Sequence, residues 1–232
     1  MAEKVVIGNA ELWHGDCREV LPLLPAHDLL LTDPPYGIGR DGKPPSTSSH
    51  GGHKGYKFMG WDADAPPAWL FGLMHEKAAN LIIWGANYYP QHLRPSMGWL
   101  VWDKGQRISQ SDCELAYSTL DKALRSMTLN RAAIARDGAV HPTQKPVQVM
   151  AWCLDFAADA QTVLDPFMGS GTTGVACAQL GKSFTGIERE REYFDIACER
   201  IARAQAQGQL LPPEPFDADR PMVQRSLLGS DE

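Results

Sequence analysis

The sequence lacks any apolar run that approaches the ~18 consecutive residues needed to cross a membrane. It also lacks a C-x-x-C pair, and its five cysteines are an odd number. A disulfide framework and a cysteine-rich zinc site are therefore not expected, and such cysteine usage is typical of a reducing compartment. Glu3 and Lys4 stand where a signal peptide would begin its apolar core. We expect a cytoplasmic protein with no membrane partner and no metal.

Positive charge is scarce as well. The chain has 22 Lys and Arg against 28 Asp and Glu, for a net charge of -6. A polycation that binds nucleic acid over its whole surface is excluded, so any such binding must use a local basic face. The 232 residues are 44% hydrophobic, which is enough for one sizeable globular domain.

Apolar runs and helical patterns alternate along this chain. Strands are expected at residues 4–7, 10–13, 28–32, 80–84, 99–102, 113–118, 163–165 and 183–187. Helices are expected after Asp16, which is a suitable N-cap, and at 66–79, 147–157 and 193–204. The helix at 66–79 is expected to carry Trp69, Leu70, Leu73 and Met74 on one face. The order predicts an α/β fold with a mostly parallel sheet.

Residues 162–174, T-V-L-D-P-F-M-G-S-G-T-T-G, have the pattern of a strand, a glycine turn and a helix start. Glycines allow a close approach of the backbone to a ligand, and the free N–H groups of the first helical turn favour an acceptor group. Gly169, Gly171 and Gly174 also spell G-x-G-x-x-G. A turn that binds no ligand would have the same pattern, so the neighbouring residues must decide.

Two carboxylates flank this turn. Glu188 ends the next strand, about 20 residues on, where an acid can accept hydrogen bonds from a ribose. Asp165 precedes the turn and occupies the place near which a diphosphate would otherwise lie. The pattern favours a nucleoside cofactor with an amino group or positive charge over one with a pyrophosphate.

A second strand ends in Asp33-Pro34-Pro35-Tyr36. The two prolines cannot donate ladder hydrogen bonds, so they end the strand and stiffen the turn. A plain X-Pro-Pro loop is the alternative interpretation. The position at the carboxyl end of a buried strand favours a ligand site, because open α/β sheets bind ligands there.

Two segments hold the basic residues that stand out against the acidic average. The long loop at 39–65 and the segment at 122–136 could contact phosphates, or could be ordinary solvated surface. The candidate DNA-binding residues, which include two between these segments, are Arg40, Lys43, Lys54, Lys57, Lys104, Arg107, Lys122, Arg125, Arg131 and Arg136.

Three motifs together resemble the amino-group DNA methyltransferases that depend on S-adenosylmethionine. They are D-P-P-Y at 33–36, H-P-T-Q-K-P at 141–146 and D-P-F-M-G-S-G-T-T at 165–173. The catalytic motif precedes the cofactor motif, as in the circularly permuted β-group, and the resemblance covers about residues 15–202. It implies a Rossmann-like fold with helices on both faces of the sheet. It also implies one catalytic domain at 1–207, with DNA-contacting insertions near 37–65 and 104–140 and a loose tail at 208–232.

The resemblance also implies roles for individual residues. In the catalytic motif Asp33, Pro34, Pro35 and Tyr36, the Asp33 carboxylate and the Pro34 carbonyl would accept the two amino hydrogens of a base. Tyr36 would stack on that base after it flips out of the duplex. The cofactor-binding residues would be Asp16, Cys17, Asp33, His141, Thr143, Gln144, Lys145, Asp165, Phe167, Gly169, Ser170, Gly171, Thr172, Thr173 and Glu188. Thr143, Gln144 and Lys145 would close over the methionine carboxylate.

The implied substrate is adenine N6 in double-stranded DNA, because the Asp form of the motif is more often associated with adenine. Cytosine N4 is the alternative, and RNA or protein glutamine is a third. A nicotinamide dehydrogenase would explain the glycines but not D-P-P-Y. An inactive DNA-binding module has no support, since none of the expected catalytic or cofactor residues is missing. Restriction–modification is the context that the resemblance implies, and homodimers are frequent in that group.

Overall fold

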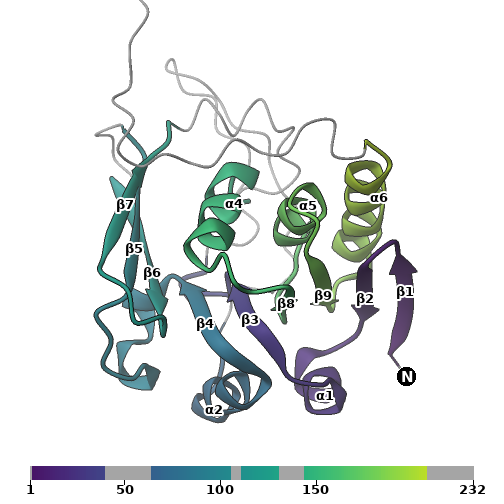
Figure 1. The fold of residues 1–232 in the computed structure, drawn as a ribbon. Coiled ribbons are helices and arrows are strands. Elements are labelled where there is room, and N and C mark those ends of the chain that lie inside the picture. The colour runs from purple at the N-terminus through teal and green to yellow at the C-terminus, as the bar shows by residue number, and fades with distance from the viewer. Residues whose placement is uncertain (1, 40–63, 106–110, 131–143, 208–232) are drawn as a thin grey trace, which may run out of the picture.

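A nine-stranded sheet forms the centre of the protein (Figure 1). The computed structural model describes residues 2–39, 64–105, 111–130 and 144–207. In chain order the strands are β1 (Glu3–Ile7), β2 (Ala10–His14), β3 (His27–Thr32), β4 (Ala78–Trp84), β5 (Trp99–Asp103), β6 (Cys113–Ser118), β7 (Arg125–Thr128), β8 (Thr162–Asp165) and β9 (Ser183–Glu188). Their order across the sheet is β1-β2-β9-β8-β3-β4-β6-β5-β7. Five of the eight strand pairs are parallel, and β1 and β6 make the sheet mixed.

Helices cover both faces of this sheet, which confirms the predicted α/β class (Figure 1). The α-helices are α1 (Cys17–Val20), α2 (Ala68–Lys77), α4 (Val147–Phe156), α5 (Thr172–Gln179) and α6 (Arg191–Gln207). Short 3-10 turns are η1 (Leu21–Leu23), η2 (Ala86–Tyr88) and η3 (Pro90–His92). Helices α4, α5 and α6 lie on one face, and α1 and α2 lie on the other. In the described ranges, no helix has both the length and the apolar composition to cross a bilayer.

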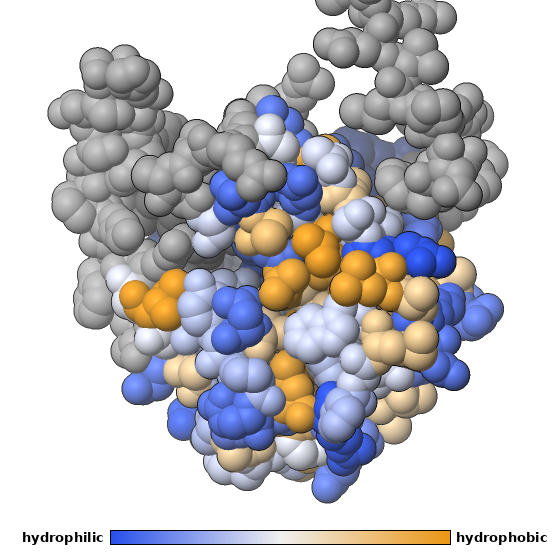
Figure 2. Space-filling view, turned by 90° about the vertical axis from the view of Figure 1, so that its left-hand side faces the viewer, coloured by the Kyte–Doolittle hydropathy of each residue, from blue (hydrophilic) through white to orange (hydrophobic). Residues whose placement is uncertain are grey.

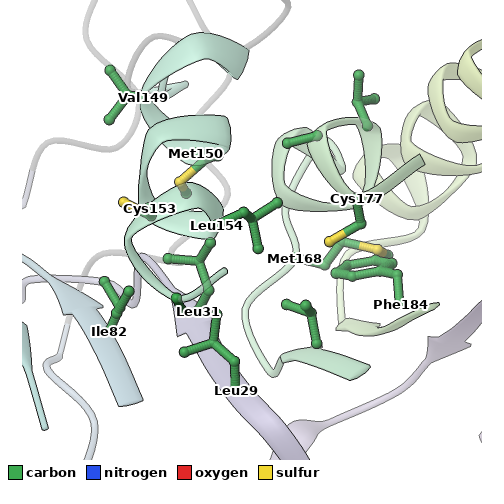
Figure 3. Packing of buried hydrophobic residues seen from close by; sticks show 14 of the residues in the cluster. Leu29, Leu31, Ile82, Val149, Met150, Cys153, Leu154, Met168, Cys177 and Phe184 are labelled. Atoms are coloured by element: carbon green, nitrogen blue, oxygen red, sulfur yellow. The ribbon is translucent and has the colours of Figure 1, made fainter. Parts of the chain in front are cut away.

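The continuous apolar run of β3 arises because this strand is buried on both faces. Leu29 and Leu31 belong to the core under α4, α5 and α6, and Figure 3 shows them beneath the α4 residue Leu154. Leu30, which points to the opposite face, belongs to the second core with Leu70 of α2. Alternation with a period of two thus places successive leucines in two separate cores.

The sheet has its topological switch point between β3 and β8, which are adjacent and parallel. From β3 the chain continues through α2 to β4, whereas from β8 it continues through α5 to β9 on the other side. The carboxyl ends of adjacent strands at such a point border a crevice in which open α/β sheets bind ligands. The motifs at 33–36 and 165–173, far apart in the sequence, follow these two strands. This is the permuted order predicted above.

Two parts of the fold differ from the prediction. Strand β7 was not predicted, and together with β6 it makes part of the expected 104–140 insertion a portion of the central sheet. The buried residues of α2 are Leu70, Phe71 and Met74, whereas Trp69, predicted to share a face with Leu70 and Met74, is 53% exposed. Residues 40–63, 106–110, 131–143 and 208–232 lie outside the described residues, so most of the 37–65 insertion and the predicted tail do too. The single catalytic domain at 1–207 stays a prediction.

Gly174 permits the close packing of α5 on its neighbours. A Cβ atom there would lie 2.4 Å from Ile201 Cδ1 of α6 and 2.7 Å from Phe184 Cε1 of β9. We expect Gly174→Ala to lower the free energy of unfolding by about 1–3 kcal/mol, because overpacking outweighs the gain in helix propensity. The matched control is Gly72→Ala in α2, where nothing lies within 4 Å of the added atom. Urea unfolding should show Gly72→Ala unchanged or more stable, and equal effects of both substitutions would contradict the packing argument.

Candidate active site

A cavity of about 350 Å³ opens beside the carboxyl ends of β3, β8 and β9. Ligand-binding cavities in proteins commonly measure about 300–1,000 Å³. Asp33, Asp165 and Glu188, which follow or end these strands, all line it, and Leu70 of α2 and Met150 of α4 add apolar wall. The cavity therefore occupies the crevice that the switch point creates.

Asp165 holds the turn after β8 in shape. One of its oxygens accepts a hydrogen bond from the Thr32 hydroxyl at 2.6 Å and another from the Phe167 N–H at 3.1 Å. The other oxygen accepts from the Thr173 hydroxyl at 2.7 Å. Burial raises the pKa of Asp165 to about 6, against the opposing effect of these donors. Its carboxylate thus ties β3, the turn and the start of α5 together.

Glu188, the last residue of β9, hydrogen-bonds to the backbone of the glycine turn. Its Oε2 accepts from the Gly169 N–H at 2.8 Å, and its Oε1 accepts from the Glu190 N–H at 2.7 Å. Burial raises the pKa of Glu188 to about 7 and outweighs these two amides. A carboxylate can accept more than two hydrogen bonds, so Glu188 has capacity left for a ligand's hydroxyl groups. The Gly169 N–H already donates to a carboxylate, which makes the turn unlike a phosphate cradle.

Arg200 of α6 supports the same turn. Its guanidinium donates to the Ser170 carbonyl at 2.6 Å and to the Ser170 hydroxyl at 2.9 Å. The hydroxyl donates to Gln144 Oε1 at 3.2 Å, which joins the segment before α4 to the glycine turn. Gly171 faces α6, where a Cβ would lie 2.9 Å from Ala197 Cβ, so it is a packing residue.

The motif after β3 forms a compact polar cluster. The Tyr36 hydroxyl donates to Asp33 Oδ1 at 2.6 Å, and the Tyr36 ring stacks on Tyr88 with centroids 4.7 Å apart and planes at 16°. Burial raises the pKa of Asp33, while the ammonium of Lys145 opposes that shift. Asp33 and Pro35 line the cavity, and Pro34 is buried.

Lys145 lies in the middle of an ion-pair network. Its Nζ is 2.6 Å from Asp33 Oδ2, 2.9 Å from Glu114 Oε2 and 3.1 Å from the Tyr36 hydroxyl. Lys104 Nζ is 2.7 Å from Glu114 Oε1. The network joins the end of β3, β6 and the segments that follow β5 and precede α4.

Most of the predicted cofactor residues meet at this cavity. Those that line it are Asp16, Cys17, Asp33, Gln144, Lys145, Asp165, Phe167, Gly169, Ser170, Thr172, Thr173 and Glu188. Gly171 does not line it, for the packing reason given above. His141 and Thr143 lie outside the described residues. The cofactor-binding roles themselves stay predictions.

The predicted DNA contacts divide into three groups. Lys104 is buried and ion-paired with Glu114, which disfavours a DNA contact for this side chain, and its predicted role stays untested. Lys122 and Arg125 are exposed, just before and on the edge strand β7. Figure 2 shows that the described residues on this side of the molecule are a mixture of hydrophilic and hydrophobic ones. The other predicted contacts, outside the described residues, are Arg40, Lys43, Lys54, Lys57, Arg107, Arg131 and Arg136.

Several residues of this site were not predicted from the sequence, Glu114, Tyr88 and Arg200 among them. Glu114 was assigned only to a strand, although an acid within the apolar run C-E-L-A-Y-S is a signal that could have identified it. Tyr88 and Arg200 carry no local signal, because their contacts with Tyr36 and Ser170 come from the tertiary fold. Among the described residues, no three His, Cys, Asp or Glu side chains gather as a metal site.

Comparison with known proteins agrees with this arrangement. The type II methyltransferase M2.LlaDCHI of Lactococcus lactis subsp. cremoris is 44% identical over 69 residues, which are 29% of this chain and 26% of that protein. The match therefore spans only about a quarter of the relative's length.

Solved structures share the fold at low identity. The M1.HpyAVI complex with SAM has a TM-score of 0.55 at 21% identity, over 83% of this chain and 98% of that one. The cytosine-N4-specific PvuII DNA methyltransferase has a TM-score of 0.56 at 14% identity, over 84% and 87% of the two chains. A family model described as DNA methylase, N6_N4_Mtase, matches residues 77–199, more than half of the sequence. The chain belongs to this family of DNA methylases.

Proposed function

We propose that this protein transfers the methyl group of S-adenosylmethionine to the exocyclic N6 of a flipped-out adenine in double-stranded DNA. The observation that carries the proposal is the shared cavity. Asp33 and Pro35 of the D-P-P-Y motif line the same space as the glycine turn and Glu188. A methyl donor held by the turn would therefore lie beside the group that receives the amino hydrogens.

The cavity suits a cationic nucleoside. Six acidic residues and three basic residues line it, and two of the basic ones, Arg18 and Arg189, are ion-paired with Asp16 and Glu190. Glu188 can accept hydrogen bonds from ribose hydroxyls. The excess of carboxylates disfavours a pyrophosphate, which supports S-adenosylmethionine over a dinucleotide.

When bound, S-adenosylmethionine supplies an electrophilic methyl group on its sulfonium. The amino nitrogen of a base is a weak nucleophile, because its lone pair is delocalised into the ring. The Asp33 carboxylate and the Pro34 carbonyl would accept its two hydrogens and free that lone pair for attack. Tyr36 would stack on the base, and such stacking contributes about 1–3 kcal/mol. The rate gain would come from positioning and preorganised charge.

Adenine is favoured over cytosine because Asp33 occupies the first position of the motif. The amino groups of adenine N6 and cytosine N4 need the same two acceptors, so the geometry of Asp33 and Pro34 serves either base. Cytosine N4 is therefore the second candidate.

The direct test is incubation of the full chain with methyl-labelled S-adenosylmethionine and, separately, duplex DNA, RNA and a protein mixture. We expect label in DNA alone. Label in RNA or protein, or cofactor binding with no transfer to DNA, would contradict the proposed substrate class.

The ionisation of Glu188 should make cofactor affinity depend on pH. Ribose hydroxyls donate best to the ionised carboxylate, so binding lowers its pKa, and affinity should rise between about pH 6 and 8 and then level off. We expect Glu188→Gln to weaken calorimetric affinity at the higher pH by about 10- to 100-fold, the value of hydrogen bonds to a charged group, and to flatten the pH dependence. The surface variant Glu199→Gln is the control. Unaltered affinity in Glu188→Gln would refute the ribose assignment.

A further inference from the structure

Four charged side chains of alternating sign form a chain that ends at the catalytic motif. Lys104 contacts Glu114, Glu114 contacts Lys145, and Lys145 contacts Asp33, with N–O distances of 2.7, 2.9 and 2.6 Å. The side chain of Lys145 is 4% exposed. Such a buried ammonium is costly unless it is paired, so the two carboxylates set where it lies.

All three donors of Lys145 are in use. An ammonium has three N–H groups, and the acceptors here are Asp33 Oδ2, Glu114 Oε2 and the Tyr36 hydroxyl. In this arrangement Lys145 donates hydrogen bonds to Asp33 and Tyr36 of the D-P-P-Y motif. It has no donor left for the carboxylate of a methionine, which the resemblance had implied as its partner.

The charges of this network stabilise one another. Burial alone would raise the pKa of Glu114, but the ammonium groups of Lys145 and Lys104 outweigh it and lower the pKa to about 2. Burial would lower the pKa of Lys145, but the carboxylates of Asp33 and Glu114 outweigh that effect and raise it. Both groups are therefore charged across the neutral range, and Lys145 presents a fixed positive charge to Asp33.

The positive charge of Lys145 favours the ionised form of Asp33. The burial of Asp33 favours the protonated form, and a protonated carboxyl would have a hydroxyl where the base amino group needs an acceptor. The titratable groups that act on it are Lys145, Glu114 of β6, Tyr36 of the same motif, Tyr89 after η2, and Asp165 of β8. Lys145 is the cation among these five groups.

We propose that Lys145 and Glu114 are positioning residues for methyl transfer: Glu114 orients the Lys145 ammonium, and Lys145 holds the Asp33 carboxylate as a charged, oriented acceptor. This assignment rests on the function proposed above. Neither residue needs to touch the base or the methyl donor, since both act through Asp33.

The test compares Lys145→Met and Glu114→Gln with the wild-type chain. In Lys145→Met we expect kcat to fall by about 10²-fold, the usual cost of misplacing a catalytic group, with calorimetric affinity for S-adenosylmethionine unchanged. The acid limb of the kcat/KM profile should move up by about 1–3 pH units, since an opposite charge at this distance lowers a carboxyl pKa by that amount. Glu114→Gln should also lower kcat, but less, because Lys145 loses one of its two carboxylate partners. It should not move the acid limb up, because the Glu114 carboxylate itself raises the pKa of Asp33. The double variant should lose less kcat than the product of the two effects.

Lys4→Met and Glu11→Gln provide the matched control, because they remove a Lys–Glu pair of similar length, 2.8 Å, on the surface of β1 and β2. These variants should keep wild-type activity. Loss of cofactor affinity in Lys145→Met, together with an unshifted pH profile of kcat/KM, would overturn the proposal. Lys145 would then be assigned to cofactor binding.

A carbon-13 NMR titration of the Asp33 carboxyl separates this inference from the proposed function, because it needs no turnover. The titration midpoint of Asp33 should rise in Lys145→Met by about 1–3 pH units. It should fall in Glu114→Gln, because the Glu114 carboxylate raises the pKa of Asp33 and this variant removes that charge. Glu114→Gln keeps the size of the side chain and serves if the methionine variant does not fold. A midpoint equal to that of the wild type in both folded variants would refute the inference, whatever reaction the enzyme catalyses.

Discussion

Replacing Asp33 with alanine is expected to abolish methyl transfer while S-adenosylmethionine still binds. In the proposed mechanism the Asp33 carboxylate accepts a hydrogen of the base amino group and frees its lone pair, and alanine has no acceptor there. Loss of a single preorganised charge-stabilising group commonly lowers kcat by about 10²–10³-fold, so activity should fall at least that far. The turn at 165–173 and Glu188 are left intact, and calorimetric affinity for the cofactor should therefore stay close to wild type.

The variant also removes one partner of the buried Lys145, which keeps its contact with Glu114. Unfolding curves must therefore accompany the kinetics, so that lost stability is not mistaken for lost chemistry. Asp159→Ala is the control, since Asp159 is exposed and its side chain lies away from the cavity lining. Retained activity in folded Asp33→Ala would remove this carboxylate from the mechanism.

Gly85→Ala is expected to give the second large effect, although Gly85 does not line the cavity. A Cβ there would lie 2.0 Å from Tyr36 Cε1, far closer than van der Waals contact, and Gly85 has φ 68°, in the left-handed region. Tyr36 must move, and it would lose its stacking on Tyr88 and its hydrogen bond to Asp33. A displacement of about 1 Å at a catalytic centre can cost about 10²-fold, which is the expected fall in kcat/KM.

Gly8→Ala separates the backbone effect from the clash. Gly8 has φ 57° in the turn between β1 and β2, and an added Cβ would meet only the end of the Gln205 side chain. Both variants should lose about 1–2 kcal/mol of unfolding free energy from the left-handed conformation, but only Gly85→Ala should lose activity. Equal activities, measured with labelled cofactor, would show that Tyr36 does not need the space that Gly85 provides.

The sequence was most informative where local pattern and motif coincide. The apolar run before Asp33 predicted β3, and the run before Asp165 with its glycine turn predicted β8 and the start of α5. Both are buried parallel strands, whose continuous apolar residues are readable without tertiary information. The α/β class followed from their alternation with helices.

The ion-pair network was not predictable in the same way. Lys145 belongs to a recognisable motif, but its partners Asp33 and Glu114 come from distant parts of the chain and meet only when β3, β4 and β6 align. Lys104 looked like a surface cation because its charge, and not its burial, is visible in the sequence. Strand β7 was missed because Arg125 and Ser126 interrupt any apolar pattern, and the strand is specified by its pairing with β5.

We propose that the cavity beside Asp33 supports methylation of an exocyclic amino group in DNA. The most direct measurement is mass spectrometry of nucleosides from duplex DNA after incubation with the protein and S-adenosylmethionine. We expect N6-methyladenine with the wild-type chain and none with Asp33→Ala. N4-methylcytosine would instead show that cytosine is the target base, with the same mechanism of methyl transfer. Unmethylated DNA with a folded, cofactor-binding protein would contradict the proposed function.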